Sequence, residues 1–589
     1  MRKNYGAKPF SYPQPVFIIA AYDENGLPNA MNAAWGGISE MKEISICISE
    51  GHKTTANILK RKAFTVSMAE VGQVVACDYV GIVSGNKVTD KFARAGFHAT
   101  RSEFVDAPLI DELSVAVECK LKDYNPETCI LRGEIVNVSV DERVLDENGK
   151  VVNDEITVGG KASGVPGTVA GLLTALEKYG TMKRADVMAP AIKHAGEGII
   201  VSKNLEGIIQ DNYEKLVKFD AASEVYLKDG LPYEAGDRLV NKDLAATLTK
   251  ISKEGKKAFY EGEIAKKIAD EVQKQGGLMT VEDLKNYTIE EREPVVGKYR
   301  DYTIISCPPA SSGGTHIVQL LNMVENYDLK AMGDNTPESW HIWAESMKQA
   351  FADRAEYMGD TAYVKVPLKG LTSKEYAKEV VKKIDLEKAG KDIKIGDPSK
   401  YESGSTTHFS VMDKDGNMVA VTQTINYFFG SGVVVPGTGI MMNNEMDDFV
   451  PQKNMKNSIE GGKRPLSSMS PTLVLDPKNR PLMTIGSPGA TRIIPAVALT
   501  ISNVIDHGMT LQEAINAPRI AQFQSGKLNA EGRMSFESYN KLQEMGHEIN
   551  MRGTYDNYFG GVQGVMMDYD TKTLQGGADP RRDGQAASF

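Results

Sequence analysis

Two threonines and an asparagine, Thr406, Thr424 and Asn426, are the first candidates for chemistry in this sequence. The runs HFSVMD and MVAVTQT are strand-like, and they meet around Asp415-Gly416, which is a strong hairpin signal. If that turn closes the hairpin, residues near 406 face Thr424, and directly opposed side chains in such a pair lie about 5 Å apart. The spacing therefore predicts one polar site that contains all three residues.

A threonine hydroxyl is a weak nucleophile unless a neighbouring group takes its proton. An α-amine on the same residue can do so, because its pKa of about 8 leaves it partly neutral at physiological pH. Thr406 lies deep inside the chain, so this chemistry requires cleavage of the Ser405–Thr406 bond, which the Thr406 hydroxyl would start by attacking the Ser405 carbonyl. On composition alone, STTH is more often just the start of a strand.

Residues 155–589 resemble the γ-glutamyltranspeptidases over most of their length. The resemblance rests on separate motifs: GVPGTVAGLLTALEKYG (164–180), PPASSGGTHIVQLLN (308–322), TTHFSVMDKDGN (406–417), NNEMDDF (443–449), KRPLSSMSPT (463–472), GSPGATR (486–492) and GGADPRRDG (576–584). It implies a self-processing γ-glutamyl hydrolase or transferase that needs no cofactor. Glutathione or other γ-glutamyl amides would be donors, and water, amino acids or peptides would be acceptors. Thr406 would be the nucleophile freed by cleavage between 405 and 406, and Thr424 would support its amine and hydroxyl.

The same resemblance implies a set of substrate-binding residues. Asn426, Glu445 and Asp448 would contact the α-amino and α-carboxylate end of the glutamyl group, and two carboxylates facing one ammonium would reject donors that lack this amine. Ser467 and Ser468 would hold the α-carboxylate through their hydroxyls. Without the resemblance, the acidic pair reads as a solvated turn and the serines as ordinary turn residues.

The backbone N–H groups of Gly489 and Ala490 would form the oxyanion hole for the tetrahedral intermediate. The family usually has Gly-Gly here, and if the position needs a positive φ, the Cβ of Ala490 costs about 1 kcal/mol. A second departure is that the family normally begins with a long segment before GVPGTVAG, which supplies an arginine for the substrate carboxylate. We identify no equivalent arginine, so weak substrate binding and exposed core surface are expected.

The elements that must position these residues fall into two different patterns. Residues 15–145 consist of short apolar runs separated by turns rich in Gly, Asn and Asp, which predicts an all-β barrel. From about 159 the chain has long amphipathic helices, followed after 405 by strands, which is typical of an α/β layered domain. We therefore expect domains at 1–150 and 151–589, and the resemblance implies that the second is the four-layer αββα sandwich of the N-terminal nucleophile hydrolases.

Residues 5–148 resemble the flavin-reductase-like and flavoredoxin split barrels that bind FMN, through NAMNAAWGGISEM (29–41), SEGHKTTANILKRKAFTVSMA (49–69) and SGNKVTDKF (84–92). A turn with His, Lys and Thr donors at a helix start suits a phosphate. The alternative without a ligand is that HKTT is a solvated helix start and NAMNAAW is a packed strand. The resemblance implies a possible homodimer through the barrel and the FMN-binding residues Asn32, Ala33, Ala34, Ser49, His52, Lys53, Thr54 and Asn57.

Bulk properties limit the partners. A chain of 589 residues is too long for one core, and a net charge of -10 disfavours nucleic acid. The five cysteines form no CxxC pair, so neither a disulfide scaffold nor a metal site is expected. Because the N-terminus does not read as a secretory signal and no apolar run is long enough to span a membrane, we expect a cytoplasmic protein with no membrane partner.

Three readings remain open from the sequence. The first is the self-processing γ-glutamyl enzyme. The second is an FMN-binding flavin reductase or redox module that carries an inactive, truncated transpeptidase half. The third is a recombined gene product with two truncated domains and little activity of either kind.

Overall fold

The computed structural model of the chain describes residues 16–70, 73–141, 155–390, 406–524 and 526–588. These residues form two compact units, Met1–Asn153 and Asp154–Phe589. Each unit has hydrophobic clusters of its own. None of the helices in the described ranges is long and apolar enough to cross a bilayer.

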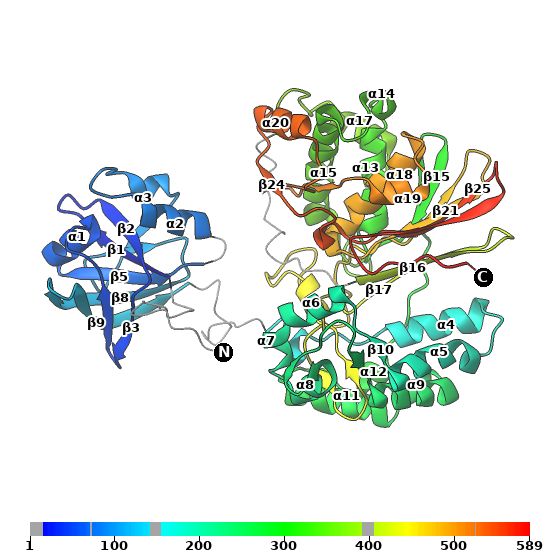
Figure 1. Ribbon diagram of the computed structural model, residues 1–589, viewed down its shortest axis with the longest axis horizontal. Helices are drawn as coiled ribbons and strands as arrows, with labels where there is room; N and C mark the ends of the chain where they lie inside the picture. The colour runs from blue at the N-terminus through cyan, green and yellow to red at the C-terminus, as the bar shows by residue number, and fades with distance from the viewer. Residues whose placement is uncertain (1–15, 71–72, 142–154, 391–405, 525, 589) are drawn as a thin grey trace. The chain divides into compact units, whose positions relative to one another are not determined.

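The first unit is a β half-barrel built on one seven-stranded sheet, in the order β2-β1-β5-β8-β9-β4-β3. Helices α1 and α2 accompany the sheet (Figure 1). The long antiparallel strands β8 and β9 pair with each other, and they join the strands β2-β1-β5 on one side of the sheet to β4-β3 on the other. The elements are β1 (Phe17–Tyr22), β2 (Pro28–Ala33), β3 (Gly36–Glu40), β4 (Glu43–Cys47), α1 (Lys53–Arg61), β5 (Ala63–Met68), α2 (Val74–Ile82), α3 (Lys91–Arg94), β6 (Ala99–Arg101), β7 (Pro108–Ile110), β8 (Val115–Asn125) and β9 (Ile130–Val140).

The centre of the second unit is an antiparallel six-stranded sheet in the order β14-β15-β20-β21-β25-β26. Its strands come from both sides of residue 406, so the two chain segments share one core. They are β14 (Val295–Tyr299), β15 (Tyr302–Ser306), β20 (Thr472–Leu475), β21 (Pro481–Gly486), β25 (Gln563–Asp568) and β26 (Thr573–Ala578).

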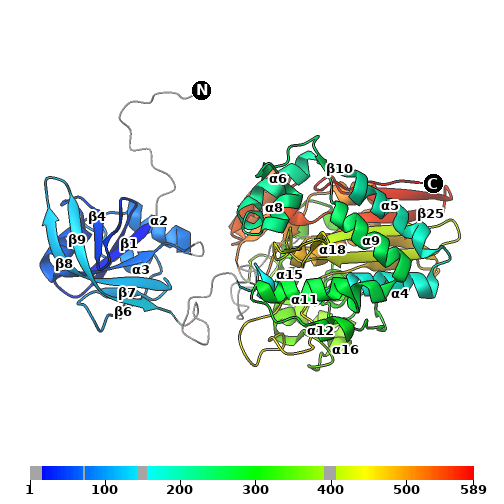
Figure 2. The ribbon, with the colours of Figure 1, turned by 90° about the horizontal axis from the view of Figure 1, so that it is seen from below.

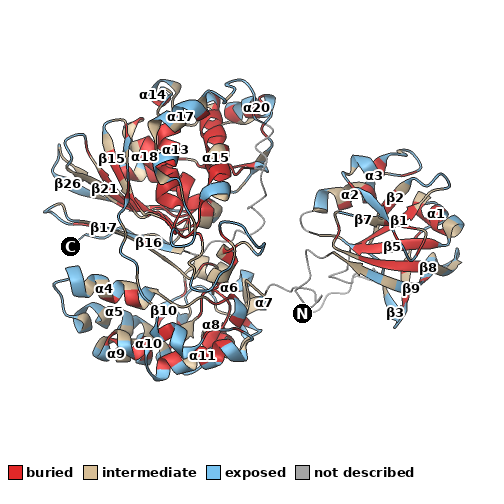
Figure 3. Cartoon of the chain, turned by 180° about the vertical axis from the view of Figure 1, so that it is seen from behind, coloured by how far each residue is buried: buried red, intermediate tan, exposed pale blue. Residues whose placement is uncertain are grey.

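Helices cover one face of this sheet, and Figure 3 shows α13 and α15 as largely buried. All residues of α13 are buried, and each large apolar side chain buried there stabilises the fold by about 2 kcal/mol. Thr336 caps α15 and Pro337 occupies its first turn, as suits a helix start. The helices are α13 (Gly313–Val324), α14 (Leu329–Met332), α15 (Pro337–Tyr357), α16 (Leu368–Leu371), α17 (Lys374–Val381), α18 (Ile493–Ile505), α19 (Leu511–Asn516) and α20 (Phe536–Glu544).

A two-stranded hairpin, β16 (Thr406–Met412) and β17 (Met418–Thr424), packs against the other face of the six-stranded sheet (Figure 1). The alternation along β21 explains the two faces. Met483 and Ile485 point into the helix-covered core, whereas the hydroxyl of Thr484 donates to the Val419 carbonyl of the hairpin at 3.1 Å.

A second group of helices lies beyond the hairpin, and Figure 2 shows α4, α5, α9 and α11 from below. These helices have their own apolar cluster, which includes Ile264 and Ile268 of α11 and Leu173 of α4. The helices are α4 (Thr168–Tyr179), α5 (Arg184–Glu197), α6 (Lys203–Asp211), α7 (Tyr213–Leu216), α8 (Asp220–Tyr226), α9 (Lys242–Glu254), α10 (Lys256–Tyr260), α11 (Glu263–Lys274) and α12 (Val281–Lys285).

The outward face of the hairpin carries exposed apolar side chains. Phe409, Val411 and Val419 are 44%, 43% and 51% exposed, although they alternate with inward-facing partners such as the buried His408. In a strand with one covered face, alternate residues point to opposite sides. Phe409, Val411 and Val419 therefore lie on the face of the hairpin that points away from the six-stranded sheet.

Candidate active site

The turn that closes the hairpin is fixed by one aspartate. The Asp413 carboxylate accepts the backbone N–H groups of Asp415 and Asn417 at 3.0 and 2.9 Å, and Gly416 adopts a φ of 84° that suits glycine. The resulting register pairs Thr406 with Thr424 across the two strands. The cross-strand pairing expected from the sequence is thus confirmed.

Thr406 stands at the first position of β16 and is half-buried. Its hydroxyl donates to the Thr424 hydroxyl oxygen at 3.2 Å, and the same oxygen accepts the backbone N–H of Asn426 at 2.8 Å. Asn426 has a φ of 68°, a left-handed conformation that asparagine tolerates better than most residues. The three residues expected to cluster are therefore joined by direct hydrogen bonds. The preceding residue, Ser405, lies outside the described residues.

Asn444 and Asn443 connect this cluster to the acidic turn at 445–448. Asn444 accepts the amide of Asn426 on its carbonyl at 3.1 Å, and its side-chain oxygen accepts the Tyr427 N–H at 2.9 Å. The side-chain oxygen of Asn443 accepts the backbone N–H groups of Glu445 at 3.0 Å and Gly164 at 2.8 Å. The motif at 164–180 thus helps to fix the acidic turn.

The acidic turn concentrates negative charge. Glu445 and Asp448 lie in one 3₁₀ turn and both are half-buried. Desolvation, together with the charges of Asp448 and Asp447, raises the pKa of Glu445 well above its usual value. A cation bound at this turn would relieve that repulsion, which is the electrostatic property required of an ammonium site.

Ser467 and Ser468 are connected to the acidic turn by Asn457. The Asn457 side chain donates to the Asp448 carbonyl at 2.6 Å and accepts the Leu466 N–H at 3.1 Å. The buried Ser468 hydroxyl accepts a hydrogen bond from Arg354 of α15 at 3.1 Å. An arginine therefore contacts one of the predicted carboxylate-binding serines, although it lies far upstream in the sequence.

Gly489 and Ala490 follow β21, the strand on which the hairpin packs. The Cβ of any residue replacing Gly486 would collide with the His408 ring, so β16 and the end of β21 are in close contact. Gly489 has a φ of 133° and Ala490 a φ of 50°. Within the described part of the chain, the backbone N–H groups of these two residues make no hydrogen bond, so both donors could serve an oxyanion.

Replacing Ala490 by glycine is expected to help, because Ala490 occupies a left-handed conformation that costs about 1 kcal/mol. If that strain displaces the oxyanion donors, kcat should rise about fivefold in Ala490→Gly. Steady-state kinetics and a urea unfolding curve measure the two effects. Lys572→Gly is the matched control, since Lys572 has a φ of 57° in the β25–β26 turn; a kcat gain shared by both variants would contradict the assignment.

Several positioning residues could not be found from local sequence. Asn457 bonds backbone atoms, and Arg354 bonds serine hydroxyls. No short sequence motif around either residue indicates that role. Asn443 and Asn444 directly precede the acidic turn, and their position in NNEMDD is the feature of the sequence that indicates a role beside it.

One buried cluster has the ligand types of a metal site. His341, Glu345 and His547 place ligand atoms within 4.8 Å of one another. The two imidazoles already share a hydrogen bond of 2.8 Å, and Lys348 donates to Glu345 at 2.7 Å. The ammonium balances the carboxylate, so the cluster is satisfied as it stands. It also joins residues from either side of position 406.

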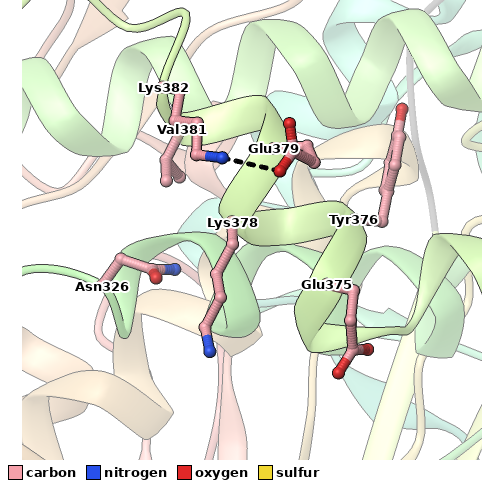
Figure 4. A pocket seen from close by; sticks show the side chains of 7 residues that line it. All are labelled: Asn326, Glu375, Tyr376, Lys378, Glu379, Val381 and Lys382. Atoms are coloured by element: carbon pink, nitrogen blue, oxygen red, sulfur yellow. Dashed lines mark hydrogen bonds and ion pairs between the residues drawn. The ribbon is translucent and has the colours of Figure 1, made fainter.

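A surface hollow on α17 is shown in Figure 4. Its lining residues are Asn326, Glu375, Tyr376, Lys378, Glu379, Val381 and Lys382, and Lys382 and Glu379 form an ion pair of 2.6 Å. The charged side chains are exposed, and none of the candidate catalytic or substrate-binding residues lines the hollow. It is therefore separate from the Thr406 cluster.

The predicted flavin residues are only partly brought together. Thr54 of α1 accepts a hydrogen bond from Asn29 of β2 at 2.6 Å, and Lys53 opens α1. Asn32 instead contacts α2, where its amide lies 3.4 Å from the Cys77 carbonyl, while the adjacent Ala33 packs into the barrel core. Because neighbouring residues in a strand face opposite sides of the sheet, Asn32 and Ala33 do not point toward the same side.

The remaining predicted flavin residues differ in exposure. Ala34, Ser49 and His52 are exposed, and Asn57 is buried in α1. The exposed residues are accessible to a ligand at the surface. Asn57 is buried, so it can contact only a ligand that reaches into the fold.

Two family profiles match the chain. The profile described as Gamma-glutamyltranspeptidase matches residues 124–589, and the profile described as Flavin reductase like domain matches residues 10–155. The profiles overlap, and the structure resolves the overlap because β9 pairs with both β8 and β4 inside the half-barrel. Residues up to the end of β9 therefore fold with the first unit.

The proteins similar to this chain include glutathione hydrolases and acylases. The glutathione hydrolase proenzyme of Escherichia coli (strain K12) is 43% identical over 451 residues, which cover 74% of this chain and 77% of the relative. The acylase ACY 1 proenzyme of Pseudomonas sp. (strain SE83) is 41% identical over 446 residues, with coverages of 75% and 78%. The crystal structure of cephalosporin acylase from Bacillus halodurans matches with a TM-score of 0.68 at 30% identity, over 74% of this chain and 79% of that one. The threonine cluster, the acidic turn and these matches agree, and the chain belongs to the gamma-glutamyltranspeptidase family.

Proposed function

We propose that this chain is a self-processing γ-glutamyl hydrolase and transferase that acts on glutathione or other γ-glutamyl amides. The observation that carries the proposal is the Thr406–Thr424 hydrogen bond at the first residue of β16, beside an acidic turn. Cleavage before Thr406 would convert that hydroxyl into the nucleophile of an N-terminal residue. We further propose the four-layer αββα arrangement, with the β16–β17 hairpin as the described part of the second sheet.

The proposed reaction has two halves. The α-amine of the freed Thr406 takes the hydroxyl proton while the oxygen attacks the γ-carbonyl carbon of the donor. The N–H groups of Gly489 and Ala490 stabilise the oxyanion, and collapse expels the amine leaving group, which takes a proton. The γ-glutamyl-threonine ester then reacts with water, which gives glutamate, or with an amino acid or peptide amine, which gives a new γ-glutamyl amide.

The acidic turn favours a γ-glutamyl donor over an acyl group without an amine. Relatives include both glutathione hydrolases and acylases, so family membership alone does not choose between these substrates. Glu445 and Asp448 place two carboxylates in one turn, and burial, followed by repulsion from Asp448 and Asp447, raises the pKa of Glu445; a substrate ammonium would offset that repulsion. A donor without an amine would leave that repulsion in place.

Glu445→Gln is expected to raise KM for γ-glutamyl-p-nitroanilide by about 10- to 100-fold, because one charge-assisted hydrogen bond is lost. The KM for glutaryl-p-nitroanilide, which lacks the amine, should change little. The wild-type KM for the γ-glutamyl donor should also rise as pH falls through the raised pKa of Glu445, since the protonated acid cannot pair with the ammonium. Glu460→Gln, an exposed change, is the control. Equal effects on both donors would contradict the ammonium site.

The second candidate activity is FMN binding by the first unit. No side chain caps the start of α1, and the buried Asn57 amide nitrogen has no partner among the described residues. Both features fit an anion held at Lys53 and the first turn of α1. FMN would supply redox chemistry when bound, while these residues would hold its phosphate. Exposed apolar residues of the unit, such as Trp35 and Ile38, support the homodimer expected for the barrel.

Lys53→Ala is expected to weaken FMN binding about tenfold, because it removes a cation from the proposed phosphate site. Riboflavin, which has no phosphate, should bind both proteins equally, and quenching of flavin fluorescence measures both affinities. Lys60→Ala, at the exposed end of the same helix, is the matched control. The phosphate site is wrong if Lys53→Ala weakens both flavins to the same extent.

A further inference from the structure

The motif PPASSGG at 308–314 takes no part in the reaction described above, yet it packs directly on the serine segment. Ser311 forms a β-bridge with Ser467, and its hydroxyl donates to the Met469 carbonyl at 2.7 Å. A side chain at Gly313 would collide with the Ser470 hydroxyl and the Ser468 carbonyl. The motif therefore fixes the backbone on which the two predicted carboxylate-binding serines stand.

Arg354 meets both segments from the last turn of α15. Its Nε donates to the Ser312 hydroxyl at 2.9 Å, and one terminal nitrogen donates to the Ser468 hydroxyl at 3.1 Å. Ser312 is completely buried, and its hydroxyl donates a hydrogen bond to the Ser467 carbonyl at 2.8 Å. One guanidinium thus orients two serine hydroxyls at once.

The direction of these hydrogen bonds matters, because a guanidinium can only donate. The Ser468 oxygen therefore accepts from Arg354, so its own proton must point elsewhere. The Ser467 oxygen similarly accepts the Met469 N–H at 3.2 Å. Neither hydroxyl donates to another residue in the described part of the chain, whereas the nearby Ser470 hydroxyl is committed to the Ser468 carbonyl at 2.8 Å.

We infer that Arg354 is a positioning residue that turns the Ser468 hydroxyl into a donor for the α-carboxylate of the γ-glutamyl substrate, while Ser312 holds the neighbouring Ser467 through its backbone carbonyl. The inference rests on the proposed function, since it assigns the carboxylate subsite of that same site. A free hydroxyl can rotate to donate or accept, and a carboxylate only accepts. Occupying each serine oxygen with an N–H donor removes the wrong orientation before substrate arrives.

The experiment compares two donors with the processed full-length protein. One is L-γ-glutamyl-p-nitroanilide, and the other is 4-aminobutanoyl-p-nitroanilide, which keeps the amine and lacks the carboxylate. Arg354→Gln and Ser312→Ala should each raise KM for the first donor by about tenfold with little change in kcat. The kinetics of the second donor should stay within about twofold of wild type.

Two further variants separate positioning from general damage. Ser470→Ala removes a hydroxyl of the same segment that already donates to backbone, so the ratio of the two donors should not change. In a double-mutant cycle, Arg354→Gln should add little to Ser468→Ala, because both act on one hydrogen bond.

The possible failures can be told apart. Equal losses on both donors, or full additivity with Ser468→Ala, overturn the positioning role. If Arg354→Gln does not fold, Ser312→Ala decides by the same criterion. A wild-type protein that processes at 406 yet turns over neither donor would instead refute the proposed function.

Discussion

Replacing Thr406 by alanine is expected to leave a single full-length chain that releases no p-nitroaniline from a γ-glutamyl donor. The variant lacks the oxygen that attacks the Ser405 carbonyl and, later, the substrate carbonyl. Loss of a covalent nucleophile lowers kcat by roughly 10⁴-fold or more. Denaturing electrophoresis and mass spectrometry after incubation measure processing, and chromophore release measures turnover.

Thr406→Ser is the matched control, because serine keeps both the hydroxyl and the future α-amine. It should still yield a fragment that begins at residue 406 and retain measurable turnover. Thr424→Ala removes the acceptor that lies 3.2 Å from the Thr406 oxygen, and an effect of about tenfold is expected on both processing and turnover. Turnover by Thr406→Ala close to that of wild type would refute the nucleophile.

Acid is expected to destabilise the second unit through three buried histidines. Burial lowers the pKa of His316, His408 and His547 to about 3 each, from an ordinary value of 6.5. The unfolded chain therefore binds protons below pH 6.5 that the native state refuses until about pH 3. The contribution of these neutral histidines to the free energy of unfolding is fully present above pH 6.5. It is lost as the pH falls toward 3, by about 1.4 kcal/mol per pH unit for each histidine.

The surroundings of each ring support this sign. Among the described residues, the His408 ring makes its hydrogen bonds to the hydroxyls of Thr422 and Ser410, at 2.7 and 3.0 Å, and neither partner is a carboxylate that could compensate its charge. Burial is the largest cause of the lowered pKa at His547, and the Lys348 ammonium adds repulsion; together they outweigh the Glu345 carboxylate, which lies 3.9 Å from the His547 Nε2. Arg354 adds a similar repulsion at His316.

Urea unfolding at several pH values tests this prediction. The buried Trp340 and Trp343 report on the second unit, and a Trp35→Phe background removes the signal of the first. His408→Gln should reduce the pH slope by about 1.4 kcal/mol per pH unit between pH 6 and 4. His194→Gln, at an exposed position on α5, is the control. An unchanged slope in His408→Gln would show that His408 does not stay neutral in the fold.

The substrate carboxylate is the point at which expectation and structure differ most. The sequence offered no arginine for it, and weak binding was expected for that reason. Arg354 now contacts Ser468, but through a hydroxyl and from α15. Its role is therefore indirect, and the expectation of weak binding stays a prediction.

Local sequence determined the parts of this protein that depend on neighbours in the chain. Asp415-Gly416 specified the hairpin turn, and a side-chain period of two then placed Thr406 opposite Thr424. The change from short apolar runs to amphipathic helices separated a β unit from an α/β unit, because those periodicities follow from backbone geometry alone.

Only the tertiary structure decided which distant residues share the site. Arg354, Ser312 and Asn457 contact predicted site residues, and Gly164 contacts Asn443 beside the acidic turn, across separations of nine to 279 positions. The longest of these contacts exist because segments from both sides of Thr406 pack on one sheet. It also decided that Ala490 has a positive φ. Local propensity carries no information on such contacts, since they are fixed by packing and by the need to satisfy buried polar groups.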